Sequence, residues 1–202
     1  MSGIFKYDNA FFRIMTKVAY IFYLNALWLL FSIPIITIGA ATAALNSVAL
    51  KMVREEEGAL TKSFLKSFRQ NFKQATLIWL VFFVAFVVLI GDIYYFAYIG
   101  GFAGTLCAGI FFMLALVAAL AFMMVFHLQA YFCYNVRGVL AASFKMALGH
   151  LVYSLALLVL FCCILYGIYV SVFLMVVLTF FGAGIFSMIS AYLMRKIFDQ
   201  YG

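Results

Sequence analysis

The chain has 202 residues, of which 69% are hydrophobic and only 9% are charged. That composition leaves too little polar surface to cover a soluble globule, so it excludes a soluble catalytic domain and indicates a single integral membrane domain over residues 1–202. The net charge of +7 does not indicate nucleic-acid binding, because the lysines and arginines lie at the ends of apolar stretches, where anionic inner-leaflet lipid attracts them.

Uncharged stretches long enough to cross a bilayer recur along the chain, at residues 18–50, 74–91, 93–136 and 151–194. Lysine and arginine gather between them, in residues 6–17 and 51–73, at Arg137 with Lys145, and at Arg195 with Lys196. If every basic cluster is cytoplasmic, the apolar region between two clusters crosses twice. The pattern therefore predicts an all-α polytopic transmembrane bundle of six spans in three hairpins, with both termini cytoplasmic.

The first hairpin follows an amphipathic N-terminal segment, residues 1–17. Pro34 is the only proline in the chain, and it disfavours helix both at its own position and just before it. With Gly39 it predicts a break between two short helices, 18–33 and 39–53. A single tilted helix over 18–40, which would leave five spans, is the alternative.

Segment 51–74 is the most polar part of the chain. On a helix over 60–74, three phenylalanines lie on one face and four basic residues on the other, which predicts an amphipathic helix lying flat at the inner membrane surface. We expect Thr61 to cap its start and Gly58 to end the preceding helix. The phenylalanines are Phe64, Phe68 and Phe72, and the basic residues are Lys62, Lys66, Arg69 and Lys73.

Two interpretations of this segment stay open. The basic face either anchors the loop to anionic lipid or docks a cytosolic partner. Three consecutive acids favour a partner, since negative charge at a helix C-terminus opposes the helix dipole and gains nothing from anionic lipid. The candidate docking residues are Glu55, Glu56, Glu57, Gly58, Lys62, Lys66, Arg69, Asn71 and Lys73.

The second and third hairpins are expected to turn at Gly100-Gly101 and near residues 167–171. Residues 137–150 predict a second amphipathic segment at the inner surface. Polar side chains within spans need partners in hydrocarbon, and the candidates are Asn25, Thr37, Thr42, Asn46, His127 and Gln129. Thr42 and Asn46 share a helix face that Asn25 could reach, serving either as contacts between helices or as part of a substrate path.

No catalytic or cofactor-binding motif is present in the sequence, and no pair of cysteines has a metal-binding spacing, so we expect no enzyme, cofactor or metal.

The first 80 residues resemble the YesL-like family of bacterial integral membrane proteins. The resemblance rests on Asn25-Ala-Leu-Trp28, on the run from Pro34 to Leu45, on Lys51 to Gly58, and on Asn71-Phe72-Lys73-Gln74-Ala75. It implies a multi-pass protein of the bacterial cell membrane that accompanies ABC-type carbohydrate transporters. The matched positions are Asn25, Trp28, Pro34, Thr37, Gly39, Glu55, Glu56, Gly58, Asn71 and Phe72.

Two functions fit these observations. The first is an accessory component that binds ABC sugar-transporter subunits through segment 51–74. The second is a transport subunit, either permease-like or an independent carrier that forms a homo-oligomer. The polar residues are concentrated in the loop rather than in the spans, which favours the first.

Overall fold

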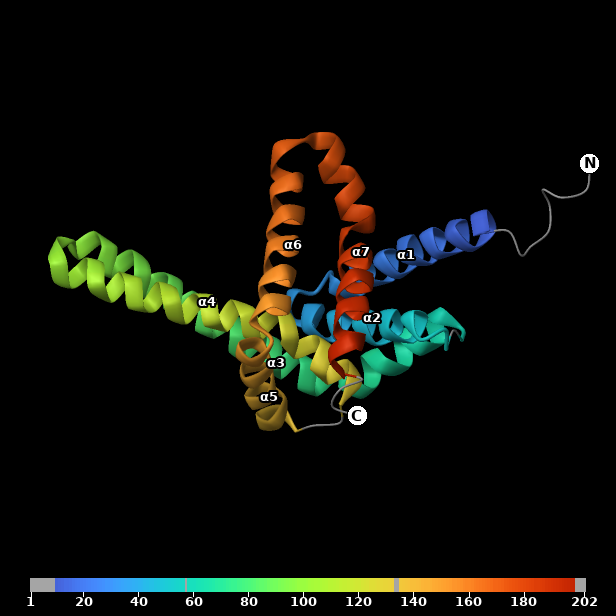
Figure 1. The fold of residues 1–202 in the computed structure, drawn as a ribbon, viewed down its shortest axis with the longest axis horizontal. Helices are drawn as coiled ribbons and strands as arrows, with labels where there is room; N and C mark the ends of the chain where they lie inside the picture. The colour runs from blue at the N-terminus through green and yellow to red at the C-terminus, as the bar shows by residue number, and fades with distance from the viewer. Residues whose placement is uncertain (1–9, 57, 133–134, 199–202) are drawn as a thin grey trace, which may run out of the picture.

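The computed structural model describes residues 10–56, 58–132 and 135–198, and this part of the chain contains helices and no strand. The elements are α1 (Ala10–Ser32), the 3₁₀ turn η1 (Ile35–Thr37), α2 (Ile38–Val53), α3 (Leu60–Ile99), α4 (Gly101–Tyr131), α5 (Val136–Gly149), α6 (Leu151–Val170) and α7 (Val172–Phe198) (Figure 1). Six of the helices, all but α5, are long and apolar enough to cross a membrane. The predicted all-α polytopic bundle with six spans is confirmed.

The chain breaks at Pro34 as predicted, so residues 18–40 do not form one helix. After α1 ends at Ser32, Pro34 is extended and η1 leads into α2. The Thr37 hydroxyl donates to the carbonyls of Phe31 and Pro34, at 2.6 and 2.7 Å. The first of these bonds satisfies a carbonyl that the end of α1 leaves without a helical partner.

Helix α2 is the centre of the bundle, with α1, α3, α4 and α7 packed around it. Its buried residues are mostly small, which lets neighbouring backbones approach closely. The closest approach is at Gly39, where an added Cβ would lie 2.6 Å from the carbonyl oxygen of Ala75 on α3. The neighbour at this close contact is therefore α3.

Two hairpins diverge from a common base. The α3–α4 hairpin extends to the left in Figure 1 and the α6–α7 hairpin extends upward. Gly100 and Gly101 make the α3–α4 turn with φ of 67° and 68°, a left-handed conformation that glycine adopts without steric cost. The α6–α7 turn is at Ser171, within the predicted range.

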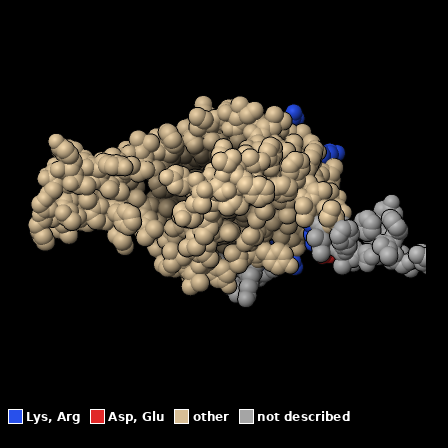
Figure 2. All heavy atoms as spheres, turned by 90° about the horizontal axis from the view of Figure 1, so that it is seen from above, with Lys and Arg blue, Asp and Glu red and all other residues tan. Residues whose placement is uncertain are grey.

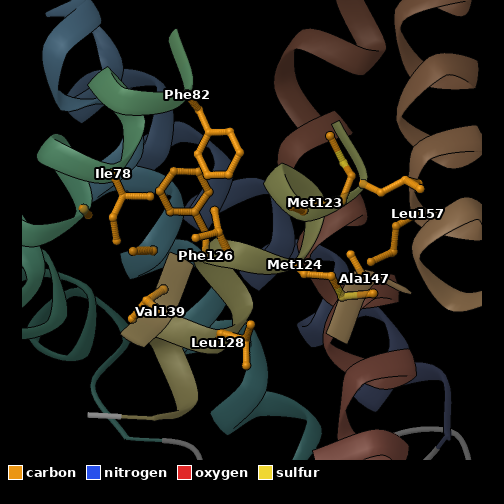
Figure 3. Packing of buried hydrophobic residues seen from close by; sticks show 14 of the residues in the cluster. Ile78, Phe82, Met123, Met124, Phe126, Leu128, Val139, Ala147 and Leu157 are labelled. Atoms are coloured by element: carbon orange, nitrogen blue, oxygen red, sulfur yellow. The ribbon is translucent and has the colours of Figure 1, made fainter. Parts of the chain in front are cut away.

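The main hydrophobic core lies at the base of the hairpins, where α3, α4, α5 and α6 meet (Figure 3). The short α5 contributes a buried face with four-residue spacing, while its Arg137 and Lys145 are exposed. The predicted amphipathic character of residues 137–150 is thereby confirmed. Core residues labelled in Figure 3 are Ile78, Phe82, Met123, Met124, Phe126, Leu128, Val139, Ala147 and Leu157.

The prediction of a separate helix over 60–74, lying flat at the membrane surface, is wrong. These residues are the first part of α3, a continuous helix of 40 residues. At 1.5 Å per residue α3 is about 60 Å long, roughly twice the thickness of the hydrocarbon layer. Phe64 is fully buried and packs with Phe68 against Phe31 of α1, so these two residues of the aromatic face contact protein, whereas Phe72 is exposed.

The predicted helix ends in this segment are also wrong. Thr61 lies inside α3, whose N-cap is Ala59 without a side-chain cap, and the Thr61 hydroxyl pairs with the Tyr23 hydroxyl at 2.7 Å. Helix α2 ends at Val53, five residues before Gly58.

Candidate functional site

One candidate site is the charged end of the bundle, defined by Lys51–Glu56 with the exposed basic residues of α3. Lys62, Lys66, Arg69 and Lys73 are all exposed along α3. On the face drawn in Figure 2, lysine and arginine gather at the right-hand end, away from the projecting α3–α4 hairpin.

The two acidic residues that the structure describes at the charged end are available to bind another protein. Glu55 and Glu56 are exposed, and neither has a cation within salt-bridge distance in the described part of the chain. Glu57 lies outside the described residues. Local pairing with the neighbouring lysines and arginines therefore does not account for Glu55 and Glu56.

The turn that carries these acids is fixed to the bundle from both sides. Arg54 donates to the Tyr131 hydroxyl at 2.8 Å, and its guanidinium carbon lies 4.8 Å from the centre of that ring. Arg195 of α7 donates to the Val53 carbonyl at 2.9 Å. Of the other docking candidates, Gly58 is exposed, whereas Asn71 is half-buried and donates to Ser67 at 3.3 Å.

Asn25 does not reach Thr42 or Asn46 but binds α7. Its side chain is fully buried, its amide nitrogen donates to the Thr179 carbonyl at 2.8 Å, and its oxygen accepts from the Gly184 amide at 3.0 Å. One side chain thus bridges two backbone groups of α7. Gly184 allows the approach, since a Cβ there would lie 2.8 Å from the Ile21 carbonyl oxygen of α1.

His127 and Asn46 both connect to α7 through buried serines. The His127 Nε2 atom lies 2.6 Å from Ser190 Oγ, and its Nδ1 atom lies 3.0 Å from the Met123 carbonyl oxygen. The Ser187 hydroxyl donates to the Asn46 side-chain oxygen at 2.7 Å. Gln129 is also buried, and neither of its amide atoms has a hydrogen-bond partner.

A second candidate site is a cavity of about 480 Å³ between α1, α2, α3, α4, α6 and α7. Most of its lining is aliphatic or aromatic, and the chain's two tryptophans, Trp28 and Trp79, both face it. Volumes of 300–1,000 Å³ with mainly apolar walls and a few polar groups are typical of small-molecule sites. The polar side chains that line it are Thr42, Asn46, His127 and Thr179.

Sequence reasoning placed Thr42 and Asn46 on one face but missed the cavity, because its other walls come from α4, α6 and α7. The one available signal was the concentration of polar residues in the first hairpin. No group of three or more His, Cys, Asp or Glu side chains that could hold a metal ion occurs among the residues whose placement is described.

Comparison with known proteins gives one match. A family model described as "Protein of unknown function, DUF624" matches residues 21–93, which include most of α1, all of α2 and most of α3. The match therefore covers the acidic turn, the basic face of α3 and one side of the cavity. No curated protein and no solved structure matches the chain.

Proposed function

We propose that this chain is a non-catalytic, multi-pass protein of the bacterial cell membrane and an accessory component of an ABC-type carbohydrate uptake or sensing complex. In this proposal the charged end is cytoplasmic, as the positive-inside bias favours, and docks a subunit of that complex.

The observation that carries the proposal is the pair of exposed acids without a local cation beside four exposed basic residues. Arg54 and Arg195 hold the turn in place, so little ordering of the backbone is needed when a partner binds. A membrane surface would attract the basic face but repel Glu55 and Glu56, whereas a protein surface of mixed charge complements both.

The carbohydrate assignment rests on the resemblance of residues 25–75 to the YesL-like family, whose members accompany carbohydrate ABC transporters. The region that carries that resemblance is also the region that carries the charged end.

The test is co-purification from native membranes in mild detergent, with the recovered proteins measured by quantitative mass spectrometry. We expect ABC permease or ATPase subunits with the wild type, and their loss when Glu55 and Glu56 are both replaced by lysine. The matched control replaces both with aspartate, which keeps the charge and should keep the partner. Equal recovery with the lysine and aspartate variants would contradict the proposal.

The cavity favours a second candidate, a transport subunit, because it lies among six apolar helices. Recovery of the protein alone as a homo-oligomer, together with substrate-dependent uptake into liposomes that contain only this chain, would replace the accessory role with an independent carrier.

A further inference from the structure

We propose that the cavity is a binding site for a neutral ester with an alkyl chain, whose carbonyl oxygen accepts hydrogen bonds from Thr42 and Asn46. The ester is either that of a bilayer phospholipid or that of a free amphiphile. This site is independent of docking at the charged end, because none of the charged-end residues lines the cavity.

The cavity walls select an apolar ligand. They combine the two tryptophans with phenylalanines from α4, α6 and α7 and with leucine and isoleucine side chains. Six helices surround the cavity. All of them except α2 expose large apolar side chains along much of their length, which is typical of contact with lipid. The helices around the cavity therefore present an apolar outer surface, from which a ligand in the bilayer would approach the cavity.

Two hydrogen-bond donors on the α2 wall of the cavity have no described acceptor. Trp28 Nε1 can only donate, so Thr42 Oγ1 accepts that bond at 3.1 Å, and no described acceptor receives the Thr42 hydroxyl proton. The Asn46 amide nitrogen is buried and has no hydrogen-bond partner among the described residues, although its oxygen accepts from Ser187. Thr42 and Asn46 lie one turn apart on α2, so both donors serve the same part of the cavity.

These groups define the polar part of the ligand. Two free donors require an acceptor oxygen, and leaving a buried donor without one is costly. The lining contains no lysine, arginine, aspartate or glutamate to compensate a charge, so the part of the ligand that lies inside the cavity is uncharged. Both ring nitrogens of His127 are engaged within the protein, and the Thr179 hydroxyl donates to the Met175 carbonyl. A sugar, whose many hydroxyls each need a partner, is not matched by this lining.

Tryptophan fluorescence reports on this site directly, because both tryptophans of the chain line it. The probes are a phosphatidylcholine with one brominated acyl chain and the methyl ester of the same brominated fatty acid. Each is titrated into the detergent-solubilised protein at a low mole fraction of the micelle, since bromine quenches tryptophan on contact. We expect saturable quenching that the unbrominated form of the same probe reverses.

The variants separate site binding from general lipid contact. Thr42→Val removes one donor and should weaken the apparent affinity roughly two- to tenfold, the value of one neutral hydrogen bond, while Thr42→Ser should bind like the wild type. Ala183→Leu adds three carbons to a residue of the cavity wall and should abolish the saturable component. Circular dichroism and gel filtration check that each variant is folded. If Ala183→Leu does not fold, the comparison of Thr42→Val with Thr42→Ser is sufficient to test the proposal.

Each outcome of these titrations either supports or contradicts the proposed ester site. Saturable quenching by the phospholipid assigns the site to a bilayer lipid, and quenching by the methyl ester alone assigns it to a free amphiphile. Quenching that rises linearly with bromine content, or that is equal in the wild type and the Thr42→Val variant, overturns the proposal. Saturable, competitive quenching relieved by an oligosaccharide also overturns it.

Discussion

Glu55 is the one residue other than glycine with a positive φ, 59°, in the described part of the chain. It occupies the position after the C-cap of α2, where helices usually place glycine. The Glu55 amide donates to the Met52 carbonyl at 3.3 Å and the Glu56 amide to the Lys51 carbonyl at 3.0 Å, which is the Schellman arrangement. A glutamate kept there at a steric cost fits a requirement for its charge.

Replacing Glu55 with glycine should raise stability while removing the charge. The left-handed conformation costs a residue with a Cβ about 1 kcal/mol, so we expect the unfolding free energy to increase by roughly 0.5–1 kcal/mol. The measurement is thermal unfolding in detergent. Glu56→Gly is the control, because Glu56 lacks a positive φ and its replacement should not raise the unfolding free energy. Equal effects of the two substitutions on stability would contradict a steric cost at Glu55.

Asn25 should be among the most important polar residues for stability. Asn25→Leu keeps the branching and the number of side-chain heavy atoms but removes both bonds to α7, and leaves the Gly184 amide without its side-chain acceptor. Hydrogen bonds between membrane helices are worth about 0.6 kcal/mol each on average, with a maximum near 1.7. We expect a loss of about 1–3 kcal/mol in unfolding free energy, measured in detergent, and a change below 0.5 kcal/mol would show that the bridge contributes little.

At the scale of helices, the packing of α2 against α3 depends on the absence of a side chain at Gly39. A Cβ there would lie 2.6 Å from both the Ala75 carbonyl oxygen and Trp79 Cβ, and a helix backbone cannot move aside cheaply. Gly39→Ala should therefore destabilise the bundle by about 1–3 kcal/mol, the usual cost of overpacking.

Gly182→Ala on α7 is the matched control for that substitution. A Cβ at Gly182 would meet Ile164 at 3.5 Å, an ordinary van der Waals distance. It should leave the melting temperature in detergent nearly unchanged. A larger loss from Gly182→Ala than from Gly39→Ala would contradict the close approach of α2 and α3.

The helix breaks could be predicted from sequence because local residues determine them. Pro34 cannot continue a helix, and Gly100 and Gly101 accept the left-handed conformation of the α3–α4 turn. The role of Phe64 could not be predicted in the same way. A helix with one aromatic and one basic face satisfies either a lipid surface or a neighbouring helix, and only the position of α1 decides between them.

The candidate site was predictable to a similar degree. The charges of the charged end are exposed as their spacing on a helix suggests, and Thr42 with Asn46 shares a face because they are four residues apart. The partners of Asn25 and Asn46 come from α7, more than 130 residues later, and no local pattern in a single sequence encodes a contact at that distance.

At the scale of the whole molecule, the six apolar helices and the position of the charges predict an orientation of the chain in a bilayer. The turns of the α3–α4 and α6–α7 hairpins lie at two separate tips, far from the charged end (Figure 1). Tyr98 and Tyr169, near these tips, are 92% and 88% exposed. Because an even number of crossings returns a chain to its starting side, we expect both tips on the face opposite the charged end if all six apolar helices cross the membrane.

Cysteine labelling in sealed right-side-out vesicles tests this arrangement. In a background with all four native cysteines replaced by alanine, Tyr98→Cys and Tyr169→Cys should react with a membrane-impermeant maleimide. Lys66→Cys should react only after the vesicles are opened, because it belongs to the charged end. If only five helices crossed, with α1 and α2 forming one crossing, the N-terminus and the charged end would lie on opposite faces. A cysteine placed before α1 would then label from the side opposite to Lys66→Cys, whereas six crossings require both to label from the same side.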